Sequence, residues 1–419
     1  MEIRQQKGKQ IAQRAAIKRD GQLWLVPSQN GHGRYKVDAE RQRCSCPDFE
    51  FRQAACKHIY AVQFTLEEIE RTKTTVTENG KTTVTETVKI KRQTYRQAWP
   101  AYNKAQTTEK AQFLYLLHKL CEGVGEPAQA TGRPRLPLED MLFSMAFKVY
   151  STMSGRRFVT DLKAAHARGY VAQPPSYNTI FRYFESEVLT PYLKMLIEES
   201  ALPLQAIEQD FAVDSSGLAT GARLKWHDTK WGRVHVEHGD TSRRVERKDW
   251  IKLHITCGVT TNIVTAVEIT DSHAGDSPQF APLVEATAQN FTMRQVSADK
   301  AYLSNANLKA VVDAQAMPYI PFKSSSTGTD RKNSSLFKQM FHFYSYNQER
   351  FMQNYHKRSN VETTFHMIKS KFGDALRSKT KTAQINEALC KVLCHNIVVL
   401  IQSMYELNLK PKFWKEVAA

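Results

Sequence analysis

The sequence predicts an α/β protein that also has a helical region and a small cysteine-bearing segment near its N-terminal end. After residue 206, strand-like apolar stretches alternate with helical ones. From about 105 to 200 the apolar side chains recur only at helical spacing, and three of the seven cysteines fall between positions 44 and 56. Alternating strands and helices are typical of a sheet covered by helices, so the largest domain is expected to be of this class.

Charge and composition narrow the class of partner. The 419 residues include 59 Lys+Arg and 42 Asp+Glu, a formal net charge of +17, which favours a polyanion such as nucleic acid or an anionic membrane surface. The densest apolar run, 397–401, is far shorter than the roughly 18 residues that a membrane span needs. The sequence therefore favours nucleic acid and no membrane. Its 41% hydrophobic content excludes a wholly disordered chain.

The N-terminal residues and the cysteines bear on location. The first ten residues, MEIRQQKGKQ, lack the apolar segment of a secretory signal. Seven cysteines are an odd and sparse set, which argues against a disulfide framework and for a reducing interior. We expect a cytoplasmic, nucleoid-associated protein of a prokaryotic cell.

The N-terminal part divides into two segments. Residues 1–70 are predicted to form short strands followed by a helix that begins near Cys56. Over 71–100 the sequence is rich in Thr, Lys and Val around Asn79-Gly80, the residue pair preferred in tight hairpin turns. A two-stranded arm or linker is expected there.

Residues 101–205 are predicted to be helical. Within them, 157–169 reads as a helix ended by glycine, and Ser176 is a suitable N-cap for a second helix over 177–187. The pair resembles a helix-turn-helix, in which Arg156 and Arg157 join the second helix in contacting DNA. Tyr177, Asn178 and Arg182 would be exposed readers, with Ile180, Phe181 and Phe184 in the core. A purely structural helical hairpin is the alternative.

Residues 206–410 are predicted to hold the α/β domain. A three-stranded meander is followed by the order α-β-α-β-α, which matches a ribonuclease-H-like domain. The expected strands are 207–213, 233–237, 250–259, 263–270, 293–297 and 317–321, and the expected helices are 278–289, 305–314, 335–350, 355–372 and 383–406.

A metal site is predicted from four residues. Cys44 and Cys46 are followed by Cys56 and His58, which supplies three thiolates and one imidazole. Zn²⁺ prefers four such ligands in a tetrahedron, and a Cys-x-Cys pair on an extended strand places both sulfurs on one side. Four unrelated residues in a surface loop are the alternative. The spacing and the Cys-x-Cys-Pro-Asp-Phe opening resemble a SWIM-type zinc finger. That resemblance implies one structural zinc ion in a module that binds DNA or protein.

Three acidic residues are the candidates for catalysis. Asp214 and Asp299 each follow an apolar strand and precede a small-residue turn, and Glu362 lies on a later helix. Ligands of α/β sheets bind at the carboxyl ends of strands, so both aspartates are expected at one edge. Carboxylate oxygens suit Mg²⁺, and two such ions clamp the attacking and leaving oxygens of phosphoryl transfer.

The helix that carries Glu362 has two distinct faces. At about 100° per residue, Tyr355, Arg358, Glu362 and Lys369 fall within about 60° of one another. The adjacent stripe, Val361, Phe365, Ile368 and Phe372, is apolar and should face the core. Taken singly, the charged residues would be ordinary solvated side chains.

Their spacing, Tyr-x2-Arg-x3-Glu-x6-Lys, resembles the signature of a large group of DDE insertion-sequence transposases and is matched at every position. The two aspartate contexts and the Leu393-Cys-His-Asn396 segment are similar to that group as well. The resemblance spans 206–406. It implies that Asp214, Asp299 and Glu362 bind two Mg²⁺ ions, that Arg358 and Lys369 hold DNA phosphate, and that Tyr355 positions a strand end.

Two features leave alternatives open. The 63-residue interval from Asp299 to Glu362 has room only for a helix or loop, so the long β insertion of some relatives, and with it a hairpin route of cleavage, is in doubt. The segment 225–247 is either a DNA-contacting loop or a plain β-hairpin. Cys390, Cys394 and His395 share one apolar helix, where buried packing is favoured over a metal site.

The sequence thus predicts a DNA transposase that binds double-stranded element ends and target DNA, then cleaves and joins them. Two ends and two active sites imply a homodimer in a synaptic complex. The alternatives are a metal-dependent nuclease of the same fold and a domesticated, non-enzymatic DNA-binding protein.

Overall fold

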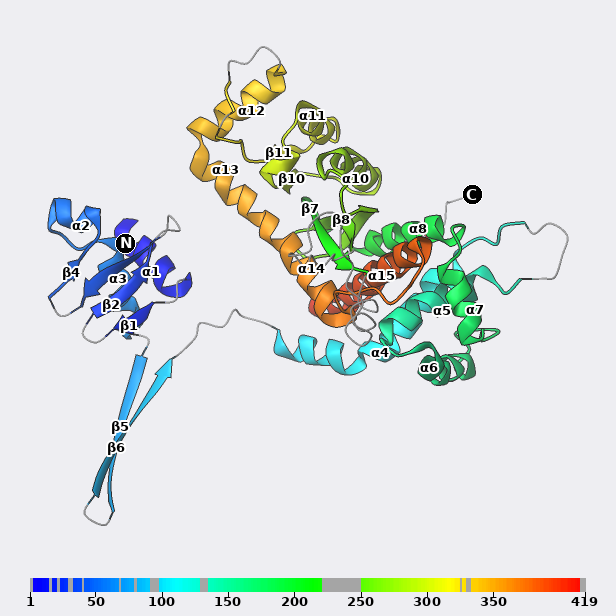
Figure 1. The fold of residues 1–419 in the computed structure, drawn as a ribbon, viewed down its shortest axis with the longest axis horizontal. Coiled ribbons are helices and arrows are strands. Elements are labelled where there is room, and N and C mark those ends of the chain that lie inside the picture. Colours follow the sequence, from blue (N-terminus) through cyan, green and yellow to red (C-terminus); the bar gives the residue numbers. More distant parts are fainter. Residues whose placement is uncertain are drawn as a thin grey trace, which may run out of the picture. The chain divides into compact units, whose positions relative to one another are not determined.

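In the computed structural model the chain divides into two compact units, residues 1–97 and 98–419 (Figure 1). The structure describes all residues except 1–2, 15–16, 21–22, 29–32, 40, 68, 79–80, 91–97, 129–134, 221–249, 325, 329–332 and 415–419. The predicted strand 233–237 and the predicted loop 225–247 lie outside the described residues.

The first unit contains a four-stranded antiparallel sheet of order β1-β2-β3-β4. Trp24, Val26 and Val37 from the sheet pack with Ile59 and Val62 from α3 in one small core. The elements are α1 Ile3–Arg14, β1 Lys18–Asp20, β2 Leu23–Pro27, β3 Arg34–Asp38, β4 Arg43–Cys44, α2 Pro47–Arg52 and α3 Lys57–Glu67.

Helix α1 was not predicted, because its sequence is mostly polar and shows little helical periodicity. It packs against α3 through Gly8, where an added Cβ would lie 2.5 Å from the Cβ of Tyr60. The close contact between α1 and α3 therefore depends on glycine, which has no side chain, at position 8. Beyond α3, β5 Ile69–Glu78 and β6 Lys81–Ile90 pair antiparallel, with Glu78 opposite Lys81. This antiparallel strand pair is the predicted hairpin arm.

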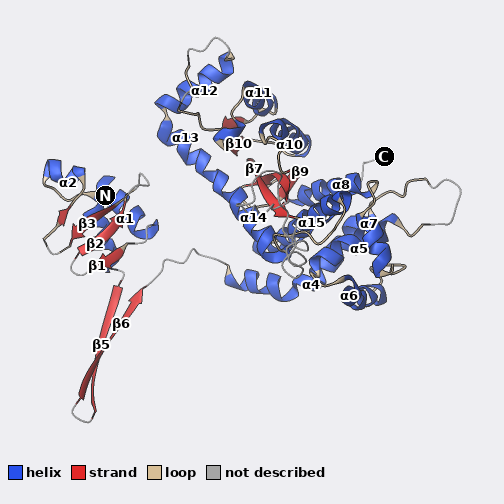
Figure 2. Ribbon diagram, in the orientation of Figure 1, coloured by secondary structure: helices blue, strands red, loops and turns tan. Residues whose placement is uncertain are grey.

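The second unit is built on a five-stranded sheet of order β11-β10-β7-β8-β9 (Figure 2). The central β7 pairs antiparallel with β8 and parallel with β10, and β10 pairs parallel with β11. This topology is ribonuclease-H-like and confirms the predicted fold class. The strands are β7 Asp210–Ala219, β8 Trp250–Gly258, β9 Val264–Asp271, β10 Gln295–Ala298 and β11 Met317–Tyr319.

Helices pack on both faces of the sheet (Figure 1). Helix α10 packs on β8 and β9, while α14 packs on β7 and β8 and α13 packs on β10 and β11. These elements are α10 Ser277–Asn290, the short η2 Lys300–Tyr302, α11 Asn305–Asp313, α12 Ser335–Tyr346, α13 Gln348–Tyr355, the short η3 His356–Arg358 and α14 Ser359–Phe372.

The predicted helix 355–372 is interrupted. Tyr355 ends α13, a 3₁₀ turn follows as η3, and α14 begins only at Ser359. The predicted helix 335–350 likewise ends at Tyr346 before α13 starts. The apolar stripe itself is as predicted, because Val361, Phe365, Ile368 and Phe372 are all buried.

The helical region and the sheet share one continuous core. Helix α15 packs against α4, α5 and α8, and reaches β9 as well. In the described part of the chain, α15 is the helix long and apolar enough to cross a membrane, but 78% of its most apolar window is buried within the protein. It is the central core helix here. The bounds are α4 Trp99–Glu122, α5 Leu138–Tyr150, α6 Gly155–Ala167, α7 Tyr177–Phe184, α8 Leu189–Ala201, η1 Leu202–Leu204 and α15 Lys381–Glu406.

Candidate active site and zinc site

Asp214 and Asp299 lie where the two central parallel strands separate. Val213 pairs with Ala298, the last residue of β10, so the two aspartates are the next residues on adjacent strands. The prediction that Asp214 ends its strand was wrong, because β7 continues to Ala219 along its antiparallel partner β8. Among the described residues, the β10-facing side of β7 has no strand partner from Asp214 until Ala219, which forms a bridge with Ala375.

The backbone holds both aspartates. The Ser215 N–H donates to Asp214 Oδ1 at 2.9 Å, and the Lys300 N–H donates to Asp299 Oδ1 at 2.6 Å. Asp299 is thereby the N-cap of η2. Each carboxylate accepts a hydrogen bond from the N–H of the residue that immediately follows it, Asp299 at a strand-to-turn transition and Asp214 within β7.

Arg358 connects Glu362 to this edge of the sheet. Its guanidinium donates to Asp214 Oδ2 and to Glu362 Oε1, each at 2.6 Å. Arg358 is on η3 and Glu362 is on the first turn of α14, so they are i,i+4 neighbours on the same surface. One cation therefore bridges two of the three predicted acids.

Electrostatics show that the three acids share one environment. Burial raises the pKa of Asp214, the negative charges of Asp299 and Glu362 add to that effect, and the Ser215 N–H and Arg358 oppose it. The pairing of Val213 with Ala298 and the contacts of Arg358 with Asp214 and Glu362 place the three predicted acids in one neighbourhood.

The other two signature residues lie at the same place. Lys369 Nζ donates to Ser216 Oγ at 2.7 Å, two residues beyond Asp214, and burial lowers the pKa of Lys369. Burial raises the pKa of Tyr355, which also senses the charges of Arg358 and Asp299. Tyr355, Arg358 and Lys369 are all half-buried, so each retains an accessible portion.

The donor set suits a hard divalent cation, since three carboxylates offer oxygen ligands only. In the part of the chain that the structure describes, only the cysteine–histidine cluster of the first unit places three or more ligand atoms close enough to share an ion. At the acidic site the Arg358 guanidinium lies between Asp214 and Glu362.

A polar network on the opposite face of β7 was not predicted. Ser215 Oγ and Lys252 Nζ each donate to Asp276 Oδ1 at 3.0 Å. Asp276 is the N-cap residue of α10. The sequence signal, Gly-Asp-Ser-Pro before a helix, indicates a cap but not the link to Asp214 through Ser215. Tyr302 is also beside the site; burial and the nearby Asp214 raise its pKa.

The zinc ligands predicted from the sequence converge in the first unit. The ligand atoms of Cys44, Cys46, Cys56 and His58 all lie within 4.8 Å of one another, and all four side chains are buried. His58 Nδ1 is 3.9 Å from the sulfurs of both Cys44 and Cys56. Ligands of a tetrahedral zinc ion lie about 3.5–3.8 Å apart, so the cluster fits a Cys₃His structural site.

The thiols of this cluster are strongly coupled. A hydrogen bond with Cys44, and a further one with His58, lowers the pKa of Cys56 to about 4. The same Cys44–Cys56 contact raises the pKa of Cys44. A thiolate already favoured at Cys56 is the form that binds a metal.

The predicted helix-turn-helix residues lie on α6 and α7. Arg156, Arg157 and Arg182 are exposed, and Ser176 accepts from the Thr179 N–H as the predicted N-cap. The Arg156 guanidinium lies 5.3 Å from the centre of the Tyr177 ring, a cation–π contact. Arg156 and Tyr177 therefore share one surface, and Tyr177, predicted to be exposed, is half-buried.

Phe181 is a correction to the predicted core of this pair of helices. Ile180 and Phe184 are buried, but Phe181 is 45% exposed. Its ring covers Gly155 at the start of α6, where an added Cβ would lie 2.5 Å from Phe181 Cζ. Phe181 therefore caps the helix junction from outside.

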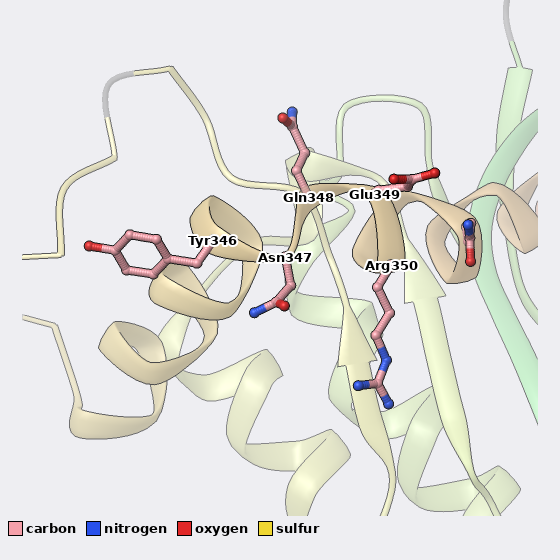
Figure 3. A pocket seen from close by; sticks show the side chains of 6 residues that line it. Tyr346, Asn347, Gln348, Glu349 and Arg350 are labelled. Atoms are coloured by element: carbon pink, nitrogen blue, oxygen red, sulfur yellow. The ribbon is translucent and has the colours of Figure 1, made fainter. Parts of the chain in front are cut away.

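Two further predictions concern places away from the acids. Cys390, Cys394 and His395 are buried on α15 as predicted, and burial lowers the pKa of His395 to about 4. A hollow of about 420 Å³ lies where α12 meets α13, lined by Tyr346, Asn347, Gln348, Glu349, Arg350 and Gln353 (Figure 3). It contains none of the predicted site residues.

Known families match the two units separately. Residues 206–397 match the family described as Transposase DDE domain, and residues 34–65 match the family described as SWIM zinc finger. No curated protein matches the chain significantly. A solved structure that resembles it is the piggyBac transposase synaptic complex with hairpin DNA, with a TM-score of 0.35, 11% identity, and coverage of 71% of this chain and 73% of that chain. Residues 206–397 are therefore a transposase DDE domain, and residues 34–65 are a SWIM zinc finger.

Proposed function

We propose that this protein is a DNA transposase that binds the ends of a mobile element, cleaves them and joins the freed 3′-hydroxyl ends to target DNA. What supports the proposal is that Asp214 and Asp299 follow paired residues of adjacent strands, and that Arg358 binds both Asp214 and Glu362, within a transposase DDE domain. That family implies phosphoryl transfer on DNA, and the acids provide the oxygen donors that the reaction requires.

The proposed roles follow from the side chains. Asp214, Asp299 and Glu362 would hold two Mg²⁺ ions, which when bound would supply polarisation of a water or 3′-hydroxyl and charge neutralisation at the phosphate. Lys369 would hold a DNA phosphate as a point charge, and Arg358 would do so as a planar fork. Tyr355, half-buried beside the acids, would orient the strand end.

The remaining contacts concern DNA binding. Arg156, Arg157, Tyr177 and Arg182 would contact a DNA duplex; the three arginines are exposed and Tyr177 is half-buried beside Arg156. The zinc finger would add affinity for element ends or for a protein partner. We also propose a homodimer in a synaptic complex, and a cytoplasmic, nucleoid-associated location in a prokaryotic cell.

A cleavage assay tests the proposed active site. Wild type should nick element-end DNA only with Mg²⁺, and Asp214→Asn should lower the rate by at least about a thousandfold, since it removes an essential metal ligand. Asp271→Asn is the matched control, an exposed aspartate at the end of β9 paired with Lys381. Equal products from wild type and Asp214→Asn would exclude the site.

A second assay separates transposase from nuclease. Precleaved ends with a free 3′-hydroxyl are mixed with a target plasmid and Mg²⁺, and joined products are sought. Nicks without joining would favour a nuclease of the same fold. DNA binding with neither product would favour a non-enzymatic, domesticated protein.

A further inference from the structure

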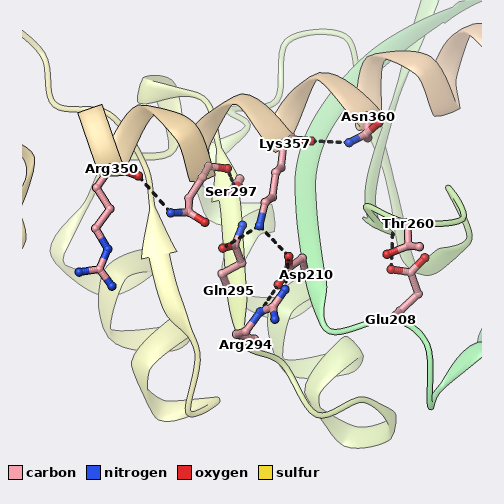
Figure 4. A network of polar contacts seen from close by, with 10 residues as sticks. Glu208, Asp210, Thr260, Arg294, Gln295, Ser297, Arg350, Lys357 and Asn360 are labelled. Atoms are coloured by element: carbon pink, nitrogen blue, oxygen red, sulfur yellow. Dashed lines mark hydrogen bonds and ion pairs between the residues drawn. The ribbon is translucent and has the colours of Figure 1, made fainter. Parts of the chain in front are cut away.

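A second aspartate on β7, Asp210, is almost fully buried and bound by two cations (Figure 4). Arg294 donates to it through Nε at 2.7 Å and Nη2 at 2.6 Å, and Lys357 Nζ donates to Oδ2 at 2.9 Å. Burial opposes ionisation of Asp210, but the bonds from Arg294 and Lys357 outweigh it and lower the pKa of this carboxyl. Asp210 is therefore a charged anchor inside the fold.

Lys357 belongs to η3, the turn that joins α13 to α14. Its ammonium lies over the β7–β10 pair, because Asp210 is directly opposite Gln295 and Gln295 Oε1 is 3.5 Å from Nζ. Ser297 Oγ of β10 also donates to the Asn354 carbonyl, at 3.4 Å. Lys357 thus attaches this turn to the centre of the sheet through an ion pair (Figure 4).

The spacing of residues along β7 links the Lys357–Asp210 ion pair to the acidic site. Asp210 and Asp214 are four residues apart on one strand and therefore face the same side of the sheet. The consecutive residues Lys357 and Arg358 contact them in turn, at 2.9 Å and 2.6 Å. Two points of attachment fix both the position and the direction of η3 along β7.

The two attachments differ in proposed role. Arg358 is assigned to DNA phosphate, and a group that transfers to a ligand cannot also hold the helix in place. Asp210 is 9% exposed in its side chain, and its contact with Lys357 involves none of the proposed metal or DNA ligands. We therefore expect the Lys357–Asp210 pair to persist when Arg358 leaves Asp214 to bind a ligand.

We propose that Lys357 is a positioning residue, whose ion pair with Asp210 holds η3 and the first turn of α14 on β7 so that Glu362 stays beside Asp214. The catalytic consequence rests on the proposed function, but the structural consequence does not. Lys357 would touch neither substrate nor metal.

Lys371, on α14, provides a matched control. Lys371 Nζ lies 2.7 Å from Glu109, and the side-chain exposures of that pair, 35% and 11%, resemble the 33% and 9% of Lys357 and Asp210. Each carboxylate keeps one partner when its lysine is removed, because Tyr150 also donates to Glu109. The two ion pairs differ mainly in the elements of the fold that they join.

The test compares Lys357→Met with Lys371→Met in the full chain. Hydrogen–deuterium exchange should rise about tenfold or more over 355–362 in Lys357→Met, and stay within about twofold of wild type there in Lys371→Met. In the cleavage assay Lys357→Met should lower kcat by about tenfold or more and raise the Mg²⁺ concentration for half-maximal rate severalfold, with KM for DNA little changed. Lys357→Arg, which retains the charge, should recover most of both.

The outcomes are separable. Wild-type exchange over 355–362 in Lys357→Met, or the same increase in Lys371→Met, would overturn the positioning role. Failure of wild type to cleave DNA would overturn the proposed function, and the exchange data would still decide the role of Lys357. If Lys357→Met does not fold, Lys357→Gln and Lys357→Arg are compared by exchange and Mg²⁺ dependence instead, and equal behaviour of these two would also refute the inference.

Discussion

Arg358 donates to Asp214 Oδ2 at 2.6 Å, joining the turn before α14 to the middle of β7. The side chains are 18% and 21% exposed, so this ion pair is largely shielded from water. The pKa of Asp214 is raised by burial and would rise further without Arg358. This relationship makes Arg358 a structural counter-ion as well as a proposed phosphate ligand.

Arg358→Met should lower the melting temperature at pH 7, by the equivalent of about 1–3 kcal/mol, because a buried carboxylate loses a charged partner. The loss should shrink towards pH 4. An acid whose folded-state pKa is raised destabilises the fold increasingly as pH rises from its unfolded-state pKa to its folded-state pKa, and fully above the latter. Circular dichroism melts at both pH values measure this. Arg294→Met is the control: Arg294 is 64% exposed and Asp210 keeps Lys357, so a change below about 1 kcal/mol is expected.

Cys56→Ser should abolish stoichiometric zinc binding, because one of four ligands is lost and the remaining three cannot close a tetrahedral site. Elemental analysis of the purified protein measures the zinc content. DNA-end affinity should fall as well, while the second unit, residues 98–419, keeps its fold. Cys121→Ser is the control, since Cys121 is buried in the other unit. Unchanged zinc in Cys56→Ser would refute the ligand assignment.

Stability should depend on pH through His395. Its side chain is buried, Nε2 contacts the Asn262 carbonyl at 2.8 Å, and burial lowers its pKa to about 4. Between about pH 6.5 and 4 the unfolded state binds the proton and the folded state does not, so stability falls as pH falls, by about 3 kcal/mol. Melts at pH 7, 5.5 and 4.5 should show a smaller slope in His395→Gln than in wild type. An identical slope in both would contradict the assignment.

Arg182→Ala should weaken binding to DNA of any sequence and reduce the salt slope by about one, as expected when one phosphate contact is lost. Arg156→Ala should weaken binding similarly, with an added loss from the Tyr177 contact. Affinity is measured by fluorescence anisotropy over a range of salt concentrations. Lys119→Ala, which removes an exposed lysine already paired with Glu122, is the control. Wild-type salt slopes in both arginine variants would favour a structural helical hairpin.

Local patterns predicted much of the architecture. The succession of strands and helices along the α/β domain, the apolar stripe of α14 and the Ser176 cap all follow from residues near one another in sequence, and the structure contains each of them. Boundaries were predicted less well. The 3₁₀ turn η3 interrupts a helix whose periodicity continues through it, because side-chain spacing does not report a change of hydrogen-bonding pattern.

The misses share a physical cause. Helix α1 is polar and packs through a glycine, so hydrophobic periodicity could not reveal it. Phe181 was placed in the core because it is apolar, but its burial depends on which helix faces it. The extension of β7 beyond Asp214 depends on its pairing with β8.

The sequence alone determined which residues are candidates for chemistry: three thiols and a histidine within one short segment, and three acids with a spaced set of cations. Tertiary structure decided how these residues are connected. Asp210 and Asp214 meet Lys357 and Arg358 across 140 or more positions of chain, and Ser215 joins Asp276 on the other face of the same strand. Such contacts depend on the register and packing of distant elements, and no local pattern of side chains encodes them.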